Sequence, residues 1–398
     1  MGVSADCIIT EFFKFYSMAV KKRKLVKKAR QKIKKTPKRG ALRRKKTNVK
    51  RAVVLRRRKK RILQKAEENP ILAPRPENHW EANQTFNPAA FVKDGKVHIL
   101  YRALGHDGIS RLGYAKSEDG ISITDRSDRP AYMARSTQHD DVADPIMYSS
   151  GGGWGGCEDP RLVCIGDRVF MTFVAFDGWG SVQMALSWID LNDFLNKKWK
   201  WKKPVFLSPP GEVHKNWVLF PEKIKGKFAI LHSISPRVLV DYFDSLDEFD
   251  ARDGRTYYIR SRYSRNSGEK RWDSWVRGAG PPPIKTKYGW LLLYHGMDEY
   301  DPDRYKIGAM ILDAKDPTKV LYRSQYPILE PDEAYENQGH KGGVIYSCGA
   351  VVVDGQLLVY YGGADTVVCV AMADLDTFLE ALVKDKPAHL KRVKSRRA

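Results

Sequence analysis

The segment GKVHILYRA (95–103) opens with a turn glycine and continues into a run of apolar and aromatic residues. The same pattern recurs as GDRVFMTFVA (166–175), GKFAILHSI (226–234), GWLLLYHG (289–296) and GQLLVYYGG (355–363). β-Branched and aromatic residues after a turn glycine predict a buried strand in each copy. The five glycines are separated by 71, 60, 63 and 66 residues, so the strands recur at an even spacing.

This spacing is too long for a solenoid repeat, and it suits a four-stranded antiparallel sheet with long loops. Equal sheets arranged radially form a β-propeller, in which each blade buries its faces against its neighbours. We therefore expect an all-β fold, a five-bladed β-propeller. The alternative is a sandwich of five unrelated hairpins, against which the even spacing argues. The segment DLDTFLEALVKD (374–385) predicts a short C-terminal helix with Asp374 as its N-cap.

The charge is divided unevenly along the chain. Residues 1–65 hold 26 Lys and Arg against Asp6 and Glu11, a net charge of +24, whereas residues 66–398 hold 44 Lys and Arg against 45 acidic residues, a net charge of −1. We predict a disordered basic tail at 1–65 and a catalytic propeller domain at 66–398. Residues 20–65 are expected to contact nucleic acid, ribosome or anionic lipid weakly and without sequence preference. A solvated tail without a partner is the alternative.

The cysteines number five and lie scattered along the chain, and none forms a pair or a Cys/His cluster with the spacing of metal ligands. We therefore expect a cytoplasmic protein with reduced thiols. We expect no metal site either, since the sequence has no HExxH motif and no calcium-binding loop. No apolar run is long enough to span a bilayer. The sequence leaves the oligomeric state open, a homo-oligomer included.

The sequence CEDPR (157–161) is the densest group of chemically active residues and precedes the second copy of the repeat. A carboxyl group in a sugar-sized pocket serves as a general acid when burial raises its pKa. The alternative is a structural turn, in which Asp159 caps backbone amides and a Glu–Arg pair holds the loop.

Cationic or protonatable side chains stand at equivalent places near the third and fourth copies: Lys215, Arg277 and His295. In a propeller these positions converge on one channel, where they would form an anion site that suits phosphate. Each of them alone would read as a surface cation. Asn87 and Arg102 flank the strand of the first copy, and Asp365 follows the strand of the last. Such side chains are the usual partners of sugar hydroxyls, although Asn-Pro and Ala-Asp-Thr also fit turns.

In these motifs the chain resembles glycoside hydrolase family 130, the β-mannoside phosphorylases and their relatives. The resemblance covers about residues 69–385 and lies in stretches that occur in family order: FNPAA, ILYRA, SRLGYAKSEDG, CEDPR, LFPEKIKGK, GAGPPPIKT, GWLLLYHG and YYGGADT. The family is similar in being a five-bladed propeller.

The resemblance implies a role for each candidate residue. Asp159 would be the general acid, with its proton relayed by a mannose hydroxyl. Asn87, Arg102 and Asp365 would hold the mannose. Lys215, Arg277 and His295 would hold inorganic phosphate, a co-substrate in a reaction that uses no cofactor. Phosphate would attack the anomeric carbon of a β-manno-oligosaccharide with inversion and release α-mannose 1-phosphate.

Two positions separate this chain from the family's phosphorylases. Ser233 stands where they carry an arginine, and Lys215 replaces another arginine. Loss of phosphate ligands suits a β-mannosidase on the same scaffold, which is the second hypothesis. A non-catalytic carbohydrate-binding or polyanion-tethered protein is the third, and the intact CEDPR and GAGPPP motifs argue against it.

Overall fold

A computed structural model of the chain describes residues 63–133, 155–176, 182–249 and 257–384, except 263, 265, 268 and 269. The chain divides into two units, residues 1–57 and 58–398, and all described residues belong to the second. Residues 1–62, which make up nearly all of the predicted basic tail, lie outside the described residues, so the tail and its polyanion contact stay predictions.

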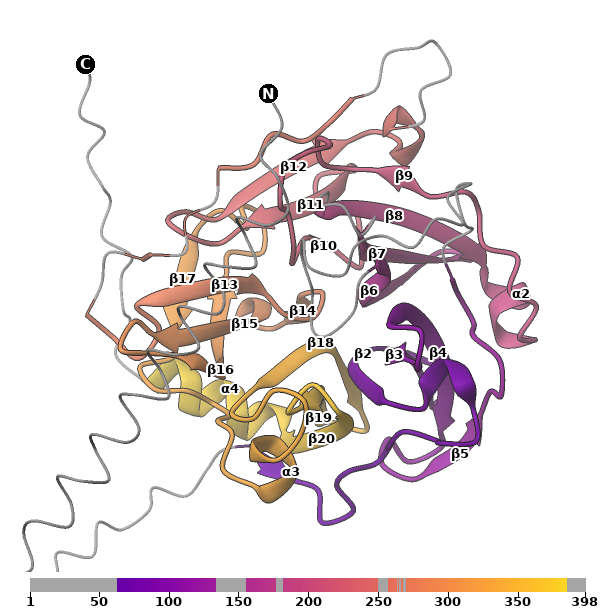
Figure 1. The fold of residues 1–398 in the computed structure, drawn as a ribbon. Coiled ribbons are helices and arrows are strands. Elements are labelled where there is room, and N and C mark those ends of the chain that lie inside the picture. Colours follow the sequence, from indigo (N-terminus) through magenta and orange to yellow (C-terminus); the bar gives the residue numbers. More distant parts are fainter. Residues whose placement is uncertain are drawn as a thin grey trace, which may run out of the picture. The chain divides into compact units, whose positions relative to one another are not determined.

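The described part is mostly β and forms five antiparallel strand groups in chain order (Figure 1). We call these groups 1 to 5. Group 1 contains β2 (Gln84–Lys93), β3 (Lys96–Leu104), β4 (Ile109–Ser117) and β5 (Ile123–Arg126), and group 2 contains β6 (Gly155–Ile165), β7 (Arg168–Phe176), β8 (Val182–Asp190) and β9 (Val205–Phe206). Group 3 contains β10 (Val218–Leu219), β11 (Phe228–Ser233) and β12 (Leu239–Phe243).

Group 4 contains β13 (Trp275–Ala279), β14 (Ile284–Thr286), β15 (Gly289–Asp298), β16 (Asp301–Leu312) and β17 (Val320–Arg323). Group 5 contains β18 (Ile345–Val353), β19 (Gln356–Gly363), β20 (Val367–Asp374) and the distant strand β1 (Gln64–Lys65). The short helices are η2 (His79–Glu81), α2 (Leu191–Leu195), η3 (Leu246–Phe249), α3 (Ala334–Asn337) and α4 (Leu375–Lys384).

The expectation of five equal four-stranded sheets is not met. The described strands form sheets of eight, five, four and three strands. Groups 1 and 2 merge into the eight-stranded sheet because β4 and β6 pair in parallel at Ile109–Gly155 and Ser110–Gly156. Group 3 stops at three strands. Hydrogen bonding alone therefore does not divide the described chain into five equal units.

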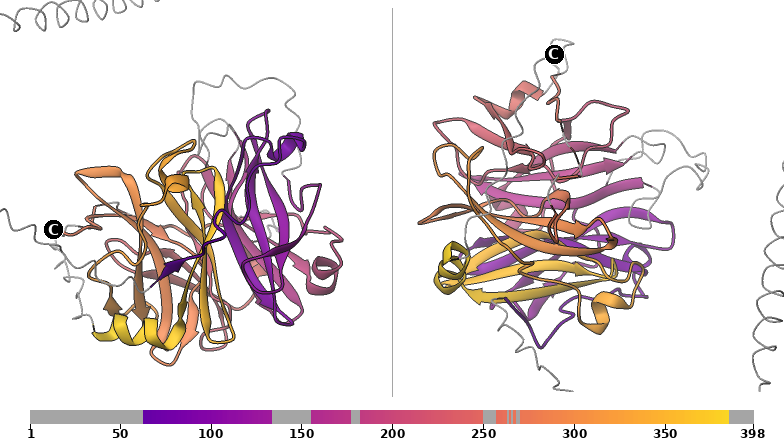
Figure 2. Two further views of the ribbon diagram at one scale, coloured as in Figure 1. Left: turned by 90° about the horizontal axis from the view of Figure 1, so that it is seen from below. Right: turned by 90° about the vertical axis from the view of Figure 1, so that its left-hand side faces the viewer.

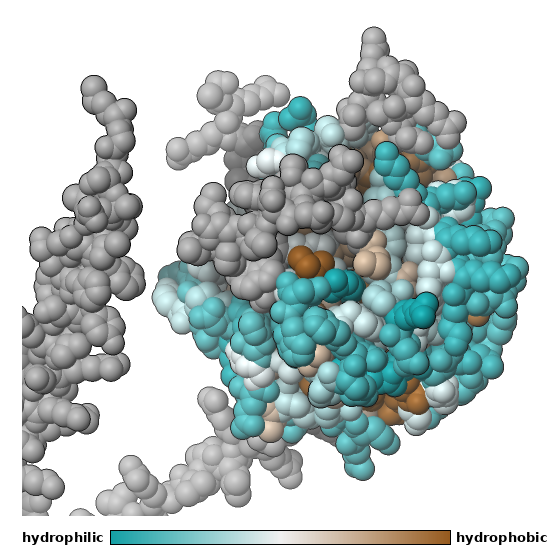
Figure 3. All heavy atoms as spheres, turned by 45° about the vertical axis from the view of Figure 1, so that its right-hand side comes forward, coloured by the Kyte–Doolittle hydropathy of each residue, from teal (hydrophilic) through white to brown (hydrophobic). Residues whose placement is uncertain are grey.

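The hydrophobic core is more regular than the sheets. A separate cluster of buried side chains joins each group to the next. Groups 1 and 2 share a cluster that includes Leu100 and Phe173, and groups 2 and 3 share one around Trp217. Further clusters join groups 3 and 4, and groups 4 and 5. The last joins group 5 back to group 1, through Tyr360 and Tyr101. The groups thus follow one another around a common centre (Figure 1), while the visible outer face is mostly hydrophilic (Figure 3).

The repeated glycines behave as the sequence predicts. Gly95, Gly166, Gly226, Gly289 and Gly355 all have positive φ, between 61° and 126°. The residues before three of them are also left-handed: Asp94 at 51°, Lys225 at 53° and Asp354 at 49°. Two consecutive left-handed residues are typical of the type I′ turn, whose twist matches that of the strands it joins. Each repeat is therefore a tight hairpin that opens a new buried strand.

A second repeat is visible only in three dimensions. In groups 1, 4 and 5, a buried tyrosine hydroxyl donates to a buried carboxylate that also binds a cation; the sets are Tyr101–Glu81–Arg126, Tyr294–Asp273–Arg323 and Tyr361–Glu336–Lys65. Gly113 and Gly308 leave the space that the rings of Tyr101 and Tyr294 occupy. A buried carboxylate is stable only when such partners neutralise it, so each set fastens the outer strands of its group.

The two ends of the described chain meet in group 5. β1 pairs with β20, and Leu63 beside it is completely buried. Residues 63–65, which we assigned to the tail, thus belong to the folded unit, because Leu63 fills the core and Lys65 pairs with Glu336. The predicted C-terminal helix is present as α4, next to β17 and β20 (Figure 2), and Asp374 accepts a 2.8 Å hydrogen bond from the backbone of Thr377. Among the described residues, no helix has the length and apolarity needed to cross a membrane.

Candidate active site

The site begins with a bulge in the first strand of four groups. The pairing register shifts at Asn87-Pro88 in β2, at Asp159-Pro160 in β6, at Arg277 in β13 and at Ser347-Cys348 in β18. A bulge redirects a side chain, and it tolerates proline because the residue leaves the hydrogen-bonded ladder. Four equivalent bulges therefore turn polar side chains toward one centre.

Asp159 lies at that centre and is 4% exposed. Asn87 donates to its Oδ1 over 2.8 Å, and Arg102 Nη1 lies 3.5 Å from the same oxygen. Arg102 also donates over 2.9 Å to Glu158, whose other carboxylate oxygen lies 3.1 Å from Lys215 Nζ. The structure thus brings together Asn87, Arg102, Asp159 and Lys215, four of the seven predicted site residues, with Glu158 as the bridge between the two cations.

The charge of Asp159 depends on these neighbours. Burial alone would raise the pKa of Asp159, but Arg102, Lys215 and Arg161 together hold that pKa below its ordinary value. The carboxyl group of Asp159 is therefore ionised at neutral pH. A general acid must be protonated before it acts, so Asp159 needs a change in its surroundings to serve in that role.

A hydrogen-bonded hub connects the remaining groups. Arg161 donates from Nε to the carbonyl of Gly280 over 2.8 Å and from Nη2 to the side-chain oxygen of Asn216 over 2.8 Å. Asn216 donates in turn to the carbonyl of Arg277 over 2.9 Å and accepts from the hydroxyl of Tyr346. These contacts join groups 2, 3, 4 and 5 around the buried arginine, so they fix the backbone on which the site is built.

A cavity of about 120 Å³ lies beside this hub, between groups 3 and 4. We call it the cation pocket, because Lys215 and Arg277 line it while no carboxylate of the described residues does. Ser233 also lines it, and its hydroxyl donates over 3.0 Å to the carbonyl of Ser235. The pocket is thus suited to an anion, as predicted for Lys215 and Arg277.

His232 also lines the cation pocket and was missed in the sequence. It is 5% exposed, and neither ring nitrogen makes a hydrogen bond to a described residue, although Nε2 lies 3.6 Å from Asp241 Oδ1. A buried polar group without a partner is costly, so His232 is suited to meet a ligand. Its place beside the serine that replaces the family's arginine is the only signal in the sequence.

His295 differs from the charged donor that we expected. It is completely buried, stacks on Tyr346 at 3.8 Å between ring centroids, and accepts a 3.0 Å hydrogen bond at Nε2 from the backbone of Ser347. Burial, and then the charge of Arg161, lowers the pKa of His295 to about 3. The imidazole is neutral, and its Nδ1 has no partner among the described residues. It also does not line the cation pocket, so His295 brings a hydrogen-bond donor to the centre but no charge.

Asp365 lies in group 5, in the turn after β19. It is 7% exposed, and its backbone carbonyl accepts a 2.6 Å hydrogen bond from Gln84. Burial raises the pKa of Asp365 to about 6, against the opposing charges of Arg102 and Lys341, and the negative charge of Asp159 raises it further. Two buried carboxyl groups of one site therefore have pKa values shifted in opposite directions.

Within the described ranges, no group of three or more His, Cys, Asp or Glu side chains is placed to hold a metal ion. The four cysteines of that part, at positions 157, 164, 348 and 369, are all unbridged.

Comparison with known proteins identifies the family to which the chain belongs. A family model described as β-1,4-mannooligosaccharide phosphorylase matches residues 56–384. The chain is 36% identical over 320 residues to a 1,2-β-oligomannan phosphorylase of Thermoanaerobacter sp. strain X514, a match that covers 79% of this chain and 97% of the relative.

Solved structures of the same family are also similar to this chain. A complex of β-1,2-mannobiose phosphorylase from Listeria innocua with β-1,2-mannobiose has 26% identity and a TM-score of 0.59, and the match covers 80% of this chain and 99% of that one. Another structure has 25% identity and a TM-score of 0.60 over 80% of this chain and 95% of that one. It was reported with the statement that this family of mannoside phosphorylases contains glycoside hydrolases that target β-1,2 mannosidic linkages in Candida mannan.

Proposed function

Because the chain belongs to glycoside hydrolase family 130, the family of the mannoside phosphorylases, we propose that it cleaves β-mannosides by inverting phosphorolysis. The observation that carries the proposal is the cation pocket. Lys215 in its wall acts electrostatically on the buried acid Asp159, and among the described residues no carboxylate lines the pocket itself. An inverting hydrolase needs a second carboxylate to activate water, whereas phosphate arrives as an anionic nucleophile.

In the proposed reaction, a phosphate oxygen forms a bond to the anomeric carbon while the bond from that carbon to the glycosidic oxygen breaks. Asp159 supplies the proton that the glycosidic oxygen takes up, through a mannose hydroxyl. The products are α-mannose 1-phosphate and the shortened sugar. Asn87, Arg102 and Asp365 hold the mannose, Lys215 and Arg277 hold phosphate, and His295 adds a neutral N–H donor.

The lowered pKa of Asp159 is consistent with a reaction in which phosphate binds before Asp159 takes up its proton. Lys215 is one of the cations that keep Asp159 ionised, and it also lines the cation pocket. A phosphate dianion bound to Lys215 would offset that positive charge and raise the pKa of Asp159. Phosphate would thus prepare the acid for its role, and no cofactor or metal is needed.

The same premise extends to architecture and compartment. We propose that the five strand groups form a closed five-bladed β-propeller, which the clusters between successive groups support. The unbridged cysteines support a reducing compartment, the cytoplasm.

A β-mannosidase is the second candidate, and Ser233 is the observation that favours it. This uncharged side chain lines the cation pocket where the family's phosphorylases carry an arginine. The pocket consequently holds fewer cations than those enzymes supply to phosphate.

The deciding experiment incubates the full-length protein with β-1,2- and with β-1,4-mannobiose, with and without phosphate, and follows the products by NMR. Phosphate-dependent formation of α-mannose 1-phosphate is expected, with Asp159→Asn as the inactive control. Free mannose released equally fast without phosphate would identify the hydrolase instead. Binding of the sugars without turnover in either condition would identify a carbohydrate-binding protein.

A further inference from the structure

Two histidines line the cation pocket, and they differ in what their ring nitrogens contact. His214 Nε2 lies 2.6 Å from Glu212 Oε2, so this ring already has a partner. The ring nitrogens of His232 make no hydrogen bond to a described residue, although the side chain is only 5% exposed. Both rings pack against Trp217, at 5.2 and 5.6 Å between centroids. A buried polar group without a partner is costly, so the ring of His232 is suited to a ligand and that of His214 is not.

A bulge in β11 explains why His232 lies in the pocket wall. The pairing register of β11 and β12 shifts between Leu231 and Ser233, which makes His232 the extra residue. Successive side chains of a regular strand point to opposite faces, yet His232 and Ser233 both line the cation pocket. A bulge redirects a side chain in this way, and bulges are frequent next to active sites. Group 3 thus brings an imidazole to the pocket of Lys215 and Arg277.

Asp241 on β12 lies on one side of this imidazole. Its Oδ1 is 3.6 Å from His232 Nε2, and a shift of roughly 0.7 Å would bring the pair to ordinary hydrogen-bond length. The side chain of Asp241 is 42% exposed and does not line the cation pocket, so it has room to move and its charge stays outside the pocket wall. With Nε2 on the Asp241 side, Nδ1 is the nitrogen left for a ligand.

The size and chemistry of the cation pocket indicate which ligand the imidazole meets. The volume of about 120 Å³ is well below the ~300–1,000 Å³ typical of pockets for organic ligands, which suits a small inorganic anion. Lys215 and Arg277 are donors without acceptor capacity, and phosphate oxygens accept several hydrogen bonds at once. A histidine ring that donates from both nitrogens carries one positive charge, which the uncharged Ser233 beside it cannot supply.

We propose that His232 is a further phosphate-binding residue of the cation pocket, which donates from Nδ1 to a phosphate oxygen while Asp241 accepts from Nε2. Asp241 is thus a positioning residue that acts through the ring of His232. This inference rests on the proposed function, because it takes phosphate as the ligand of the cation pocket. It also explains how the pocket holds a phosphate dianion although position 233 is a serine.

The test compares His232→Phe with His214→Phe in the full-length protein, since each keeps a ring against Trp217 and removes both nitrogens. In phosphorolysis of mannobiose, His232→Phe is expected to raise KM for phosphate about tenfold or more, the loss of a hydrogen bond to a charged group. KM for mannobiose is expected to change less than about twofold. His214→Phe is expected to raise KM for phosphate by no more than about threefold, because the nitrogen that it removes is bound to Glu212.

Three further variants test the geometry. His232→Asn places an amide N–H near the position of Nδ1, so its KM for phosphate should be lower than that of His232→Phe. His232→Gln places the amide near Nε2, so its KM should be as high as that of His232→Phe. Asp241→Asn should raise KM for phosphate about threefold in the wild type and not at all in His232→Phe. A rise of the same size in both backgrounds would overturn the positioning role of Asp241.

The possible failures are distinguishable. A wild type without phosphate-dependent turnover would overturn the proposed function, and calorimetric titration with inorganic phosphate then tests the site directly: weaker binding in His232→Phe supports it, and an equal Kd overturns it. An active wild type whose His232→Phe variant keeps its KM for phosphate would overturn the inference alone. Equal rises in KM for phosphate and for mannobiose, or equal rises in the two His→Phe variants, would overturn it as well. Thermal unfolding checks the fold, and His232→Gln carries the same expectation if His232→Phe does not fold.

Discussion

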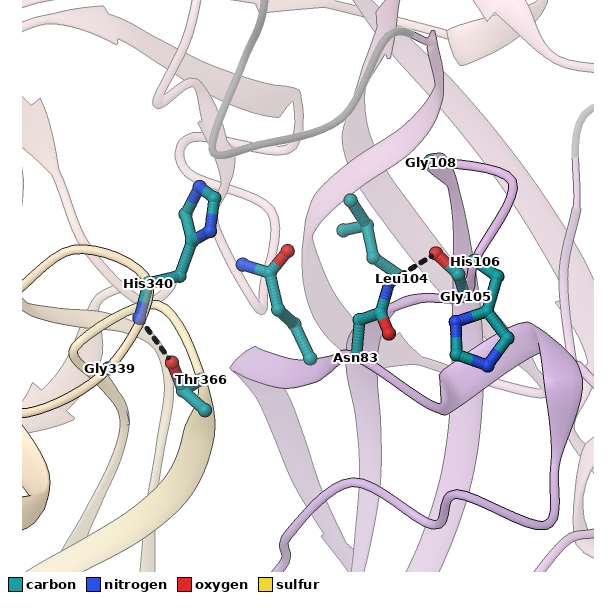
Figure 4. Close-up of a pocket in the computed structure, with 9 residues that line it drawn as sticks. Asn83, Leu104, Gly105, His106, Gly108, Gly339, His340 and Thr366 are labelled. Carbon is teal, nitrogen blue, oxygen red and sulfur yellow. Dashed lines mark hydrogen bonds between the residues drawn. The ribbon is translucent and has the colours of Figure 1, made fainter.

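The cation pocket differs in charge from a second cavity of about 330 Å³ between groups 1 and 5 (Figure 4), which is lined by Asn83, Gln84, Leu104, Gly105, His106, Gly108, Gly339, His340 and Thr366. We call this second cavity the neutral pocket. Lys215 and Arg277 line the first, and the second has no formally charged side chain. The strand framework thus fixes where a ligand lies, and a few side chains on each side decide which ligand it is.

The largest effect is expected at Asp159, the acid at the centre of the site. Asp159→Asn removes the only proton donor that we assign, and general acid catalysis contributes roughly 10²- to 10⁴-fold. We expect kcat for mannobiose phosphorolysis to fall by that amount. Glu158→Gln is the control, since Glu158 binds Arg102 and Lys215 and is assigned no proton transfer. A loss of less than about tenfold in Asp159→Asn would exclude Asp159 as the acid.

The next largest effect is expected in the cation pocket. Arg277→Ala removes a cation from the cation pocket, and a hydrogen bond to a charged group contributes about 1.5–3 kcal/mol. We expect KM for phosphate to rise roughly 10- to 100-fold while KM for the acceptor sugar changes little. Initial rates at varied phosphate concentration measure this. Equal changes in the two KM values would show that Arg277 does not act on phosphate in particular.

A smaller effect follows from the pKa of about 6 at Asp365. Above pH 6 the carboxylate is ionised and accepts hydrogen bonds from mannose hydroxyls, and below pH 6 protonation removes acceptors. KM for mannobiose is therefore expected to rise about tenfold from pH 7 to pH 5. Asp365→Asn should have a high KM that no longer varies with pH in this range. A wild-type KM that is flat from pH 7 to pH 5 would contradict the assignment of Asp365 to mannose.

The smallest effect is expected far from both pockets. Deletion of residues 1–57 leaves every described residue in place, so kcat and both KM values should stay within about twofold of wild type. Deletion of residues 1–65 also removes buried Leu63 and the Lys65–Glu336 ion pair, and it should lower the unfolding temperature. Only the full-length chain is expected to bind polyanions, and that binding should weaken steeply between about 50 and 200 mM salt.

The sequence predicted best those features that depend on neighbouring residues. The strand repeats, the turn glycines and α4 rest on neighbouring residues, and the structure confirms them. The merged sheet of groups 1 and 2 depends on two residue pairs 46 positions apart along the chain, such as Ile109–Gly155, and no local pattern marks them.

The site shows the same division. Asn87, Asp159 and Arg102 came from short motifs and lie in contact. Three features arise only when distant segments meet: the hub of Arg161 and Asn216, the ring of His232, which makes no hydrogen bond to a described residue, and the neutral pocket. Neutral side chains such as those of Asn83 and His340 give no charge pattern that a single sequence reveals.

Four residues of the site have a left-handed backbone, two of them at the bulges, and this limits which mutations the site tolerates. Asn87, Asp159, Asn216 and Asp365 have φ values of 47°, 49°, 68° and 50°, a left-handed backbone that only Gly, Asn and Asp adopt at low cost. Substitutions at these positions are therefore tolerated by the backbone only when the new residue is Gly, Asn or Asp. An Asp codon becomes an Asn codon by one base change, and that change keeps the backbone, the size and most hydrogen bonds while it removes the acid. A lineage of this fold would therefore lose catalysis in one mutational step and still bind sugar.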